Sequence, residues 1–425
     1  MEERCISIDD LPVGWEQIHL KDVCEIILGQ SPPSETYNTV GNGLPFFQGK
    51  AEFTELHPVA EKWCSVPGKI AEQNDILLSV RAPVGNTNIA DRKCCIGRGL
   101  AALRFHNYKF LFYYLQSIEK ELDKKGTGTT FKAISGDIVR NVDLPLPPLL
   151  EQNRIVAKVE ELFSELDKGV EALKAVQQQL KVYRQAVLKW AFEGSFTGGL
   201  ENWEHTTLGS ILKISSGNGL TKSTRNDDGQ YLVYGGNGVT GNHSEFMFAE
   251  PQLIIGRVGV HCGNTHITKL KSWITDNAFV VYFNSNKINI HFLFYLVKNL
   301  NLNQLSSSTA QPVISGSKVY PIKCKIPSID IQQKVNQSIE TRLSVADKLE
   351  ETISQSLQQA EALRHSILKK AFAGQLVPQD PSDEPASKLL ERIKTEKARQ
   401  ATIKGSVRGR GKKMLSSPSA SVGDP

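Results

Sequence analysis

The chain has 425 residues, 40% of them hydrophobic, and a formal net charge of +5. This length exceeds the roughly 250–300 residues that one hydrophobic core can organise, so we expect two or more globular domains and exclude a disordered chain or a small disulfide-stapled fold. The seven cysteines show no C-x-x-C spacing, which argues against a disulfide framework or a zinc ribbon and favours a reducing cytoplasm, while the mild positive charge permits nucleic-acid binding without requiring it.

Residues 1–149 predict a mixed α/β domain. The first stretch, "MEERCISIDD", is acidic where a signal peptide is basic and then apolar, and no stretch has the roughly 18 apolar residues of a membrane span, so we expect a cytoplasmic protein with no membrane partner. Short β-rich runs such as Asn74–Val80 and Gly99–Phe105 precede a helix with "FLFY" at Phe110–Tyr113. These aromatic residues are most simply core residues; a base-stacking platform is the alternative.

Residues 150–194 predict one long helix. Apolar side chains recur at steps of three and four residues, no proline interrupts Glu151–Glu193, and Gly194 is suited to a helix C-cap. A helix of this length would be a rod of about 60–65 Å. Its apolar stripe would face water on an isolated rod, so the helix needs a partner.

Residues 195–374 repeat this layout. "VLKWAFEG" at Val187–Gly194 returns 180 positions later as "ILKKAFAG" at Ile367–Gly374, within a match of more than sixty residues without a gap. Residues 195–328 therefore predict a second mixed α/β domain, and residues 329–374 a second long helix. We interpret the chain as two copies of one α/β (α+β) unit.

The two long helices are expected to pair antiparallel, which would give a pseudo-two-fold spacer with one globular domain at each end. Alternatively, each helix packs on its own domain or dimerises with another chain. The predicted seam consists of apolar side chains from both helices, Leu162, Leu166, Leu173, Leu180, Val187, Ile339, Leu349, Ile353, Leu363 and Ile367.

Residues 375–425 predict a basic, largely disordered tail. Pro, Asp and Ser follow the second rod, a short basic helix comes next, and the end "GSVRGRGKKMLSSPSASVGDP" is typical of disorder. A solubilising tail is the simple interpretation. Docking of a partner or unspecific attraction to phosphate is the alternative.

Two stretches and the duplicated layout resemble the specificity subunits of type I restriction-modification systems. They are "PLPPLLEQNRI" at Pro145–Ile155 and "DILLSVRAPVGNTNIADRKCCIGRGLAAL" at Asp75–Leu103. The second copy departs from the first motif, since "IPSIDIQQKV" keeps only Pro327 and has Ile331 in place of the acidic residue. The contacts that the two helix starts make with partners are therefore not expected to be identical.

The resemblance implies a non-catalytic protein with two target recognition domains. Each domain would read one half of a split site in double-stranded DNA, and the helices would fix the gap between the halves. It implies two methyltransferase subunits and the restriction or translocase subunits as partners. AdoMet, ATP and Mg²⁺ would belong to those partners. The sequence agrees, because it has no phosphate-binding P-loop, no N-P-P-F or D-P-P-Y stretch and no His and Cys at zinc spacing.

A DNA reader needs Lys, Arg and hydroxyl groups for phosphates, and Arg, Asn or Gln for guanine and adenine edges. For each candidate named below, the alternative interpretation is a solvent-exposed charged residue or a residue that shapes a turn. In the first domain they are Lys50, Arg81, Asn86, Asn88, Arg92 and Arg98, with Thr127, Thr129, Thr130 and Lys132 in a Gly- and Thr-rich basic loop. In the second domain they are Lys222, Arg225, Asn237, Arg257, Asn264, His266, Ser307 and Thr309.

A scaffold whose end domains bind proteins is the alternative function. Such ends should expose aromatic anchors, whereas the loops here are rich in Arg, Lys, Asn and Thr. A nuclease is a poorer interpretation, because Glu119, Glu121 and Asp123 are explained by an exposed helix face.

Overall fold

The computed structural model describes residues 11–128, 132–220, 226, 228–306 and 312–399. The chain forms two compact units. Unit 1 comprises Met1–Val170 and Gln358–Pro425, and unit 2 comprises Glu171–Leu357. Each long helix therefore contributes one part to each unit. The boundaries of these two compact units differ from those of the five segments predicted from the sequence. The five predicted boundaries therefore stay a prediction.

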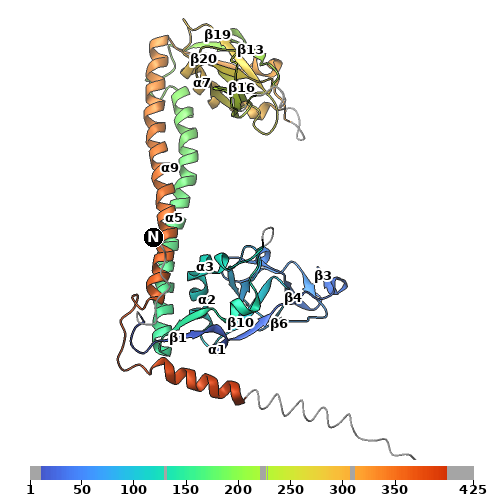
Figure 1. The fold of residues 1–425 in the computed structure, drawn as a ribbon. Coiled ribbons are helices and arrows are strands. Elements are labelled where there is room, and N and C mark those ends of the chain that lie inside the picture. The colour runs from blue at the N-terminus through green and yellow to red at the C-terminus, as the bar shows by residue number, and fades with distance from the viewer. Residues whose placement is uncertain (1–10, 129–131, 221–225, 227, 307–311, 400–425) are drawn as a thin grey trace, which may run out of the picture. The chain divides into compact units, whose positions relative to one another are not determined.

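Unit 1 contains a four-stranded antiparallel sheet (Figure 1), and the residues of its two inner strands are largely buried. The two β-rich runs predicted in this domain are these inner strands, β7 (Ile76–Ser79) and β10 (Leu100–Arg104). A second sheet of five strands includes one parallel pair, β4 with β9, and a separate antiparallel pair joins β1 to β11. In order across the sheets, the strands are β2 (Glu25–Leu28), β10 (Leu100–Arg104), β7 (Ile76–Ser79) and β8 (Thr87–Ile89); β3 (Tyr37–Asn38), β5 (Trp63–Cys64), β4 (Leu44–Phe47), β9 (Cys94–Ile96) and β6 (Ile70–Ala71); and β1 (Glu16–His19) with β11 (Asp143–Leu146).

Short helices close the core of unit 1. The longest, α2 (Tyr108–Ser117), is capped by Asn107, whose side chain accepts a hydrogen bond from the Phe110 N–H. Phe110 is fully buried and packs edge to face against Phe372 of the second long helix, so these aromatic residues are core residues. The other short helices are α1 (Leu20–Val23), η2 (Ser34–Thr36), η3 (Lys50–Glu52), α3 (Glu119–Lys124) and α4 (Gly136–Arg140).

Unit 2 repeats the strand order of unit 1, which confirms the duplication. Its four-stranded sheet has the order β13, β19, β16, β17, matching β2, β10, β7, β8, and its smaller sheet again contains one parallel pair, β14 with β18. The strands are β12 (Glu204–Thr207), β13 (Leu212–Ser216), β14 (Tyr231–Gly235), β15 (Gly238–His243), β16 (Leu253–Gly256), β17 (Thr265–Ile267), β18 (Ser272–Ile274), β19 (Ala278–Phe283) and β20 (Lys323–Ile326). The short helices are α6 (Leu208–Ile211), α7 (Ile290–Asn299), η4 (Leu302–Leu305) and α8 (Gly316–Val319).

The two long helices, α5 (Leu149–Phe192) and α9 (Ile329–Phe372), begin in the same way. The buried Gln152 amide donates to the Pro147 carbonyl at 3.0 Å, and the buried Gln332 amide donates to the Pro327 carbonyl at 2.9 Å. Each glutamine thus ties its helix to the strand end before it. The second copy lacks much of the Pro-rich motif but keeps this bond.

Both long helices end at the predicted glycine C-caps. Gly194 and Gly374 have φ of +81° and +68°, which favours glycine. In each case, the N–H of the residue after the glycine donates to the carbonyl five positions earlier, at 3.0 and 2.8 Å. These bonds satisfy carbonyls that the helix leaves unpaired.

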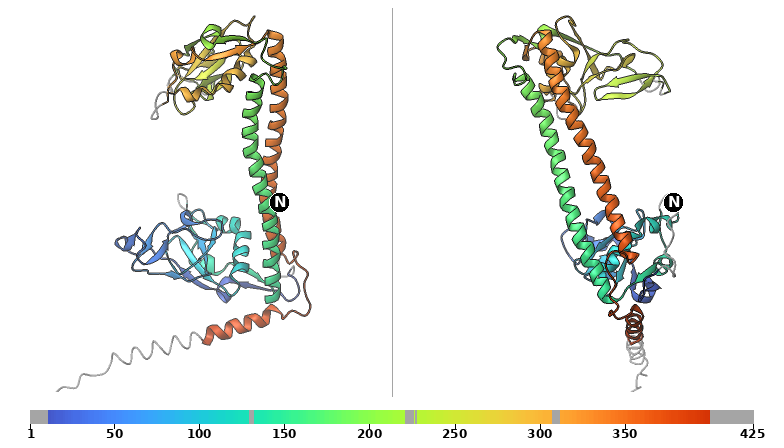
Figure 2. Two further views of the ribbon diagram at one scale, coloured as in Figure 1. Left: turned by 180° about the vertical axis from the view of Figure 1, so that it is seen from behind. Right: turned by 90° about the vertical axis from the view of Figure 1, so that its left-hand side faces the viewer.

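Within each unit, the segments of α5 and α9 lie side by side and run antiparallel (Figure 2). In unit 2, Leu180 packs with Ala346 and Ile353, and Arg184 forms ion pairs with Asp347 and Glu350. In unit 1, the Arg364 guanidinium lies 4.7 Å from the centre of the Phe163 ring and pairs with Asp167. The apolar contact is narrow, so ion pairs at its edges add to the pairing.

The prediction that Leu349 and Leu363 belong to the helix seam is wrong, because both side chains are largely exposed. Leu349 and Leu363 are 46% and 50% exposed. Each follows a buried alanine of α9 by three positions, on the side of the apolar stripe away from α5, whereas Leu357, four positions after Ile353, joins the cluster. The other predicted residues are buried or partly buried, among them Val187 and Ile339 in the core of unit 2 and Leu162 and Ile367 in that of unit 1.

Residues 375–399, expected as part of a disordered tail, pack on unit 1. A helix covers residues 386–399, as the sequence predicted, and Leu389 and Leu390 are each 8% exposed. The Lys397 ammonium donates to the carbonyls of Lys21, Asp22 and Cys24 at 2.9–3.2 Å, around the end of α1. The composition concealed this docking because the apolar face of the helix is short. Residues 400–425 lie outside the described residues.

Candidate nucleic-acid interface

Three backbone segments of unit 1 lie side by side where strands β4, β7 and β9 end. The Gly97 N–H donates to the Phe47 carbonyl at 2.8 Å, and the Val80 N–H donates to the Gly99 carbonyl at 2.9 Å. A Cβ on Gly99 would lie 2.2 Å from the Gln48 carbonyl oxygen, so only glycine permits this approach. The side chains that follow these strands are thereby fixed in one place.

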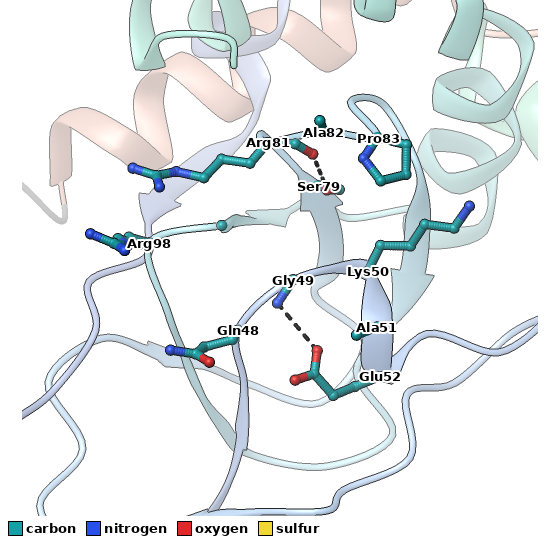
Figure 3. Close-up of a pocket in the computed structure, with 11 residues that line it drawn as sticks. Gln48, Gly49, Lys50, Ala51, Glu52, Ser79, Arg81, Ala82, Pro83 and Arg98 are labelled. Atoms are coloured by element: carbon teal, nitrogen blue, oxygen red, sulfur yellow. Dashed lines mark hydrogen bonds between the residues drawn. The ribbon is translucent and has the colours of Figure 1, made fainter. Parts of the chain in front are cut away.

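These side chains line an open cavity of about 640 Å³. Arg81, Arg98 and Gln48 extend toward one side of it, and Lys50 extends toward the other (Figure 3). Among the described residues, none of the three cations forms an ion pair, while the Glu52 carboxylate accepts a hydrogen bond from the Gly49 N–H at 3.2 Å. The cavity therefore combines three cations that form no ion pair and one carboxylate, a net positive charge, with the amide of Gln48, which suits phosphate oxygens and base edges.

The sequence predicted three of these residues but missed Gln48. No motif marks Gln48, and only the parallel pairing of β4 with β9 brings it beside Arg98. Pairing across about fifty residues is a property of topology, which residue types alone do not reveal.

The other candidates of unit 1 are engaged within the protein or exposed elsewhere. Asn88 is corrected, because it is fully buried and its amide exchanges hydrogen bonds with the backbone of Thr54. Asn86 donates to Glu119, Arg92 pairs with Asp91, and Lys132 pairs with Asp123. Thr127 is exposed, whereas Thr129 and Thr130 lie outside the described residues.

Arg257, a candidate of unit 2, makes contacts within its own unit. The Arg257 guanidinium donates to the Ser216 hydroxyl at 3.2 Å and to the Asp276 carbonyl at 3.3 Å, and it lies 5.6 Å from the centre of the Phe279 ring. Such contacts are typical of an arginine that shapes a loop. Both hydrogen bonds use the same guanidinium nitrogen, so Arg257 remains a candidate for DNA contact.

Two asparagines of unit 2 meet between strand ends. The Asn264 side-chain amide donates to the side-chain Oδ1 of Asn237 at 3.1 Å, which leaves the Oδ1 acceptor of Asn264 and the Nδ2 donor of Asn237. The nearby His266 is partly buried, and burial, followed by the charge of Lys298, lowers its pKa. The candidates Lys222, Arg225, Ser307 and Thr309 lie outside the described residues.

Metal-binding clusters and membrane-spanning helices are both absent from the part of the chain that the structure describes. No group of three or more His, Cys, Asp or Glu side chains there could hold a metal ion. Among the same residues, no helix is both long and apolar enough to cross a membrane.

The family model described as type I restriction modification DNA specificity domain matches this chain twice, over residues 12–177 and 200–359. The type I restriction enzyme EcoprrI specificity subunit of Escherichia coli is 26% identical over 396 residues, covering 86% of this chain and 94% of that protein. The putative MjaX specificity subunit of Methanocaldococcus jannaschii is 38% identical over 194 residues, and there the chain spans 45% of the relative's length.

Solved structures show the same fold. A chain from a type I restriction-modification system, described for its complex assembly and conformational transition, is 21% identical, with a TM-score of 0.71 over 86% of this chain and 99% of that one. The specificity subunit from Thermoanaerobacter tengcongensis gives a TM-score of 0.55, at 21% identity over 86% of this chain and 98% of that one.

Proposed function

This chain belongs to the family of type I restriction-modification DNA specificity proteins, and from that membership we propose that it is the subunit that selects the DNA sequence on which such a complex acts. Each globular domain reads one short block of a bipartite site in double-stranded DNA. The paired helices hold the two readers, so the blocks are separated by a gap that is not read.

The observation that carries this proposal is the duplication. The specificity domain matches both halves of the chain, and the same strand order recurs in both units. A bipartite DNA site needs two readers of one architecture with different reading side chains. The divergent loops on a repeated frame meet that need. Charged and amide side chains line the cavity of unit 1, which supports DNA over a protein ligand.

The chemistry is proposed to reside on partner subunits. The chain acts without catalytic residues of its own, in complex with two methyltransferase subunits and with restriction or translocase subunits. AdoMet, ATP and Mg²⁺ bind to those partners, and the complex works in the cytoplasm. Methylation of a base requires its extrusion from the stack, a task for the methyltransferase once the reader has positioned it.

Exchange of one reader tests the proposal. Residues 195–328 are replaced by the corresponding segment of a relative that recognises a different site, and the methylated motif is determined in cells that also make the cognate methyltransferase. We expect one block of the motif to change while the other block and the gap stay the same. A change in both blocks would contradict one reader per block.

A further inference from the structure

Arg81 and Arg98 are held at a fixed mutual position by the backbone. Arg81 follows Val80 and Arg98 precedes Gly99, and the Val80 N–H donates to the Gly99 carbonyl at 2.9 Å. The Ile134 N–H donates to the Val80 carbonyl at 3.0 Å, which fixes the other edge of the same segment. Both guanidinium groups extend toward the same side (Figure 3). Hydrogen-bonded segments lie about 4.8 Å apart, so the two arginines can reach neighbouring base pairs.

The same hydrogen bonds identify the equivalent positions in unit 2. There the Arg257 N–H donates to the Asn277 carbonyl at 2.9 Å, and the Ile314 N–H donates to the Arg257 carbonyl at 3.0 Å. Arg257 thus occupies the backbone place of Val80, and Asn277 that of Gly99. The residue after Arg257 is Val258, and the residue before Asn277 is the exposed Asp276.

Val258 and Asp276 therefore stand where unit 1 has Arg81 and Arg98. An isolated bridge agrees with this alignment, since Arg81 pairs with Ala133 and Val258 pairs with Val313, 180 positions after Ala133. The donors of one unit are replaced by an apolar side chain and a carboxylate in the other. Arg257 fills neither place, because it occupies the backbone position of Val80, and its Nη1 donates to the Ser216 hydroxyl and the Asp276 carbonyl.

We propose that Arg81 and Arg98 make the block read by unit 1 a guanine-containing one, and that the block read by unit 2 lacks arginine readout at the equivalent positions. This assignment rests on the proposed function. Arginine matches guanine because its fork donates to O6 and N7 together, a geometry that no other base offers in the major groove. Valine contacts a thymine methyl group, and a carboxylate accepts from the cytosine amino group, so unit 2 favours different bases at this place.

The test is selection from a random pool of DNA duplexes by the purified full chain together with its methyltransferase subunits. Wild type is compared with Arg81→Gln and Arg98→Gln. Each variant is expected to lower the enrichment of guanine in one block by about tenfold, the discrimination that a bidentate contact supplies, and to leave the other block unchanged. Arg92→Gln is the matched control, because Arg92 is also exposed but is paired with Asp91, and it should leave both blocks unchanged.

Other outcomes distinguish failure of the proposed function from failure of the base assignment to Arg81 and Arg98. A wild-type complex that selects no two-block motif overturns the proposed function and this assignment with it. A two-block motif that both arginine variants retain, with unchanged thermal stability, overturns the assignment alone. A guanine preference that Arg92→Gln also removes shows a general effect of charge and contradicts base reading by Arg81 and Arg98.

Discussion

At the residue scale, a buried carboxyl distinguishes the two copies. Glu151 is 1% exposed at the start of α5 and accepts a hydrogen bond from the Trp15 indole at 3.0 Å. In the second copy, Ile331 replaces it and Trp203 packs against Phe292. Burial raises the pKa of Glu151, although the Trp15 N–H and Arg154 oppose the shift. The first copy thus retains an ionisable group in a place where the second is apolar.

Glu151→Gln is expected to stabilise unit 1 at neutral pH. A raised folded-state pKa means that the protonated carboxyl favours the fold, and this contribution is present below the unfolded pKa and lost as the pH rises through the folded pKa. The variant should therefore match wild type near pH 4 and exceed its Tm at pH 7.5 by about 2–4 °C, the shift that 1 kcal/mol produces in a domain of this size. Thermal denaturation from pH 4 to pH 8 measures this, with the exposed Glu165→Gln as control.

A Tm difference that is the same at all pH values would contradict the ionisation of Glu151 as the cause. A difference that the control shares would point to net charge instead.

Residue types predicted the site only in part. Lys50, Arg81 and Arg98 could be named because loop cations are what DNA requires, and the structure brings all three to one cavity. Asn88 has the same chemistry but lies in a strand that faces the core, and burial is a property of tertiary packing. Gln48 and Asp276 gain their places from strand pairings distant in sequence.

At the element scale, the long helices and their glycine ends were predictable, since an uninterrupted apolar period and a C-capping glycine are local signals. It was harder to predict which apolar residues of each helix face the partner helix. Ile353 and Leu349 fit the same three- and four-residue steps, yet one is 5% exposed and the other 46%. Which side of the stripe contacts α5 depends on the partner helix.

This difference gives a matched pair of substitutions. Ile353→Asp places a charge in the cluster with Leu180 and Ala346, and should destabilise unit 2 by about 3–5 kcal/mol because a packed side chain is lost and an unpaired carboxylate is buried. Leu349→Asp, on the same helix, should change the free energy of unfolding by less than about 1 kcal/mol. Chemical denaturation of the full chain measures both. Equal losses would mean that the helices do not pair through this face.

The docked C-terminal helix depends on Lys397. Its ammonium group caps the carbonyls at the end of α1, and burial lowers the pKa of Lys397. Lys397→Ala should loosen residues 386–399, so amide exchange there should become about tenfold faster, as the loss of about 1.4 kcal/mol predicts. Lys394→Ala, at an exposed position of the same helix, is the control. Unchanged exchange in Lys397→Ala would show that the apolar face alone holds the helix.

At the scale of the whole molecule, the chain contains two copies of one structural unit that differ in the side chains of their candidate DNA-binding loops. The repeat was visible in the sequence because the long helices kept their residues, while the strand order common to both domains was not, since the loops and strands diverged. A shared frame with different side chains at equivalent positions is what two different DNA blocks require.

The most direct test of this account is single-molecule sequencing of DNA from cells that make this chain together with its cognate methyltransferase subunit, compared with cells that make the methyltransferase alone. We predict a new methylated motif of two short blocks around a fixed gap, present only with this chain. If the two proteins form a stable complex and no such motif is found, the account of this chain as a DNA specificity subunit is contradicted.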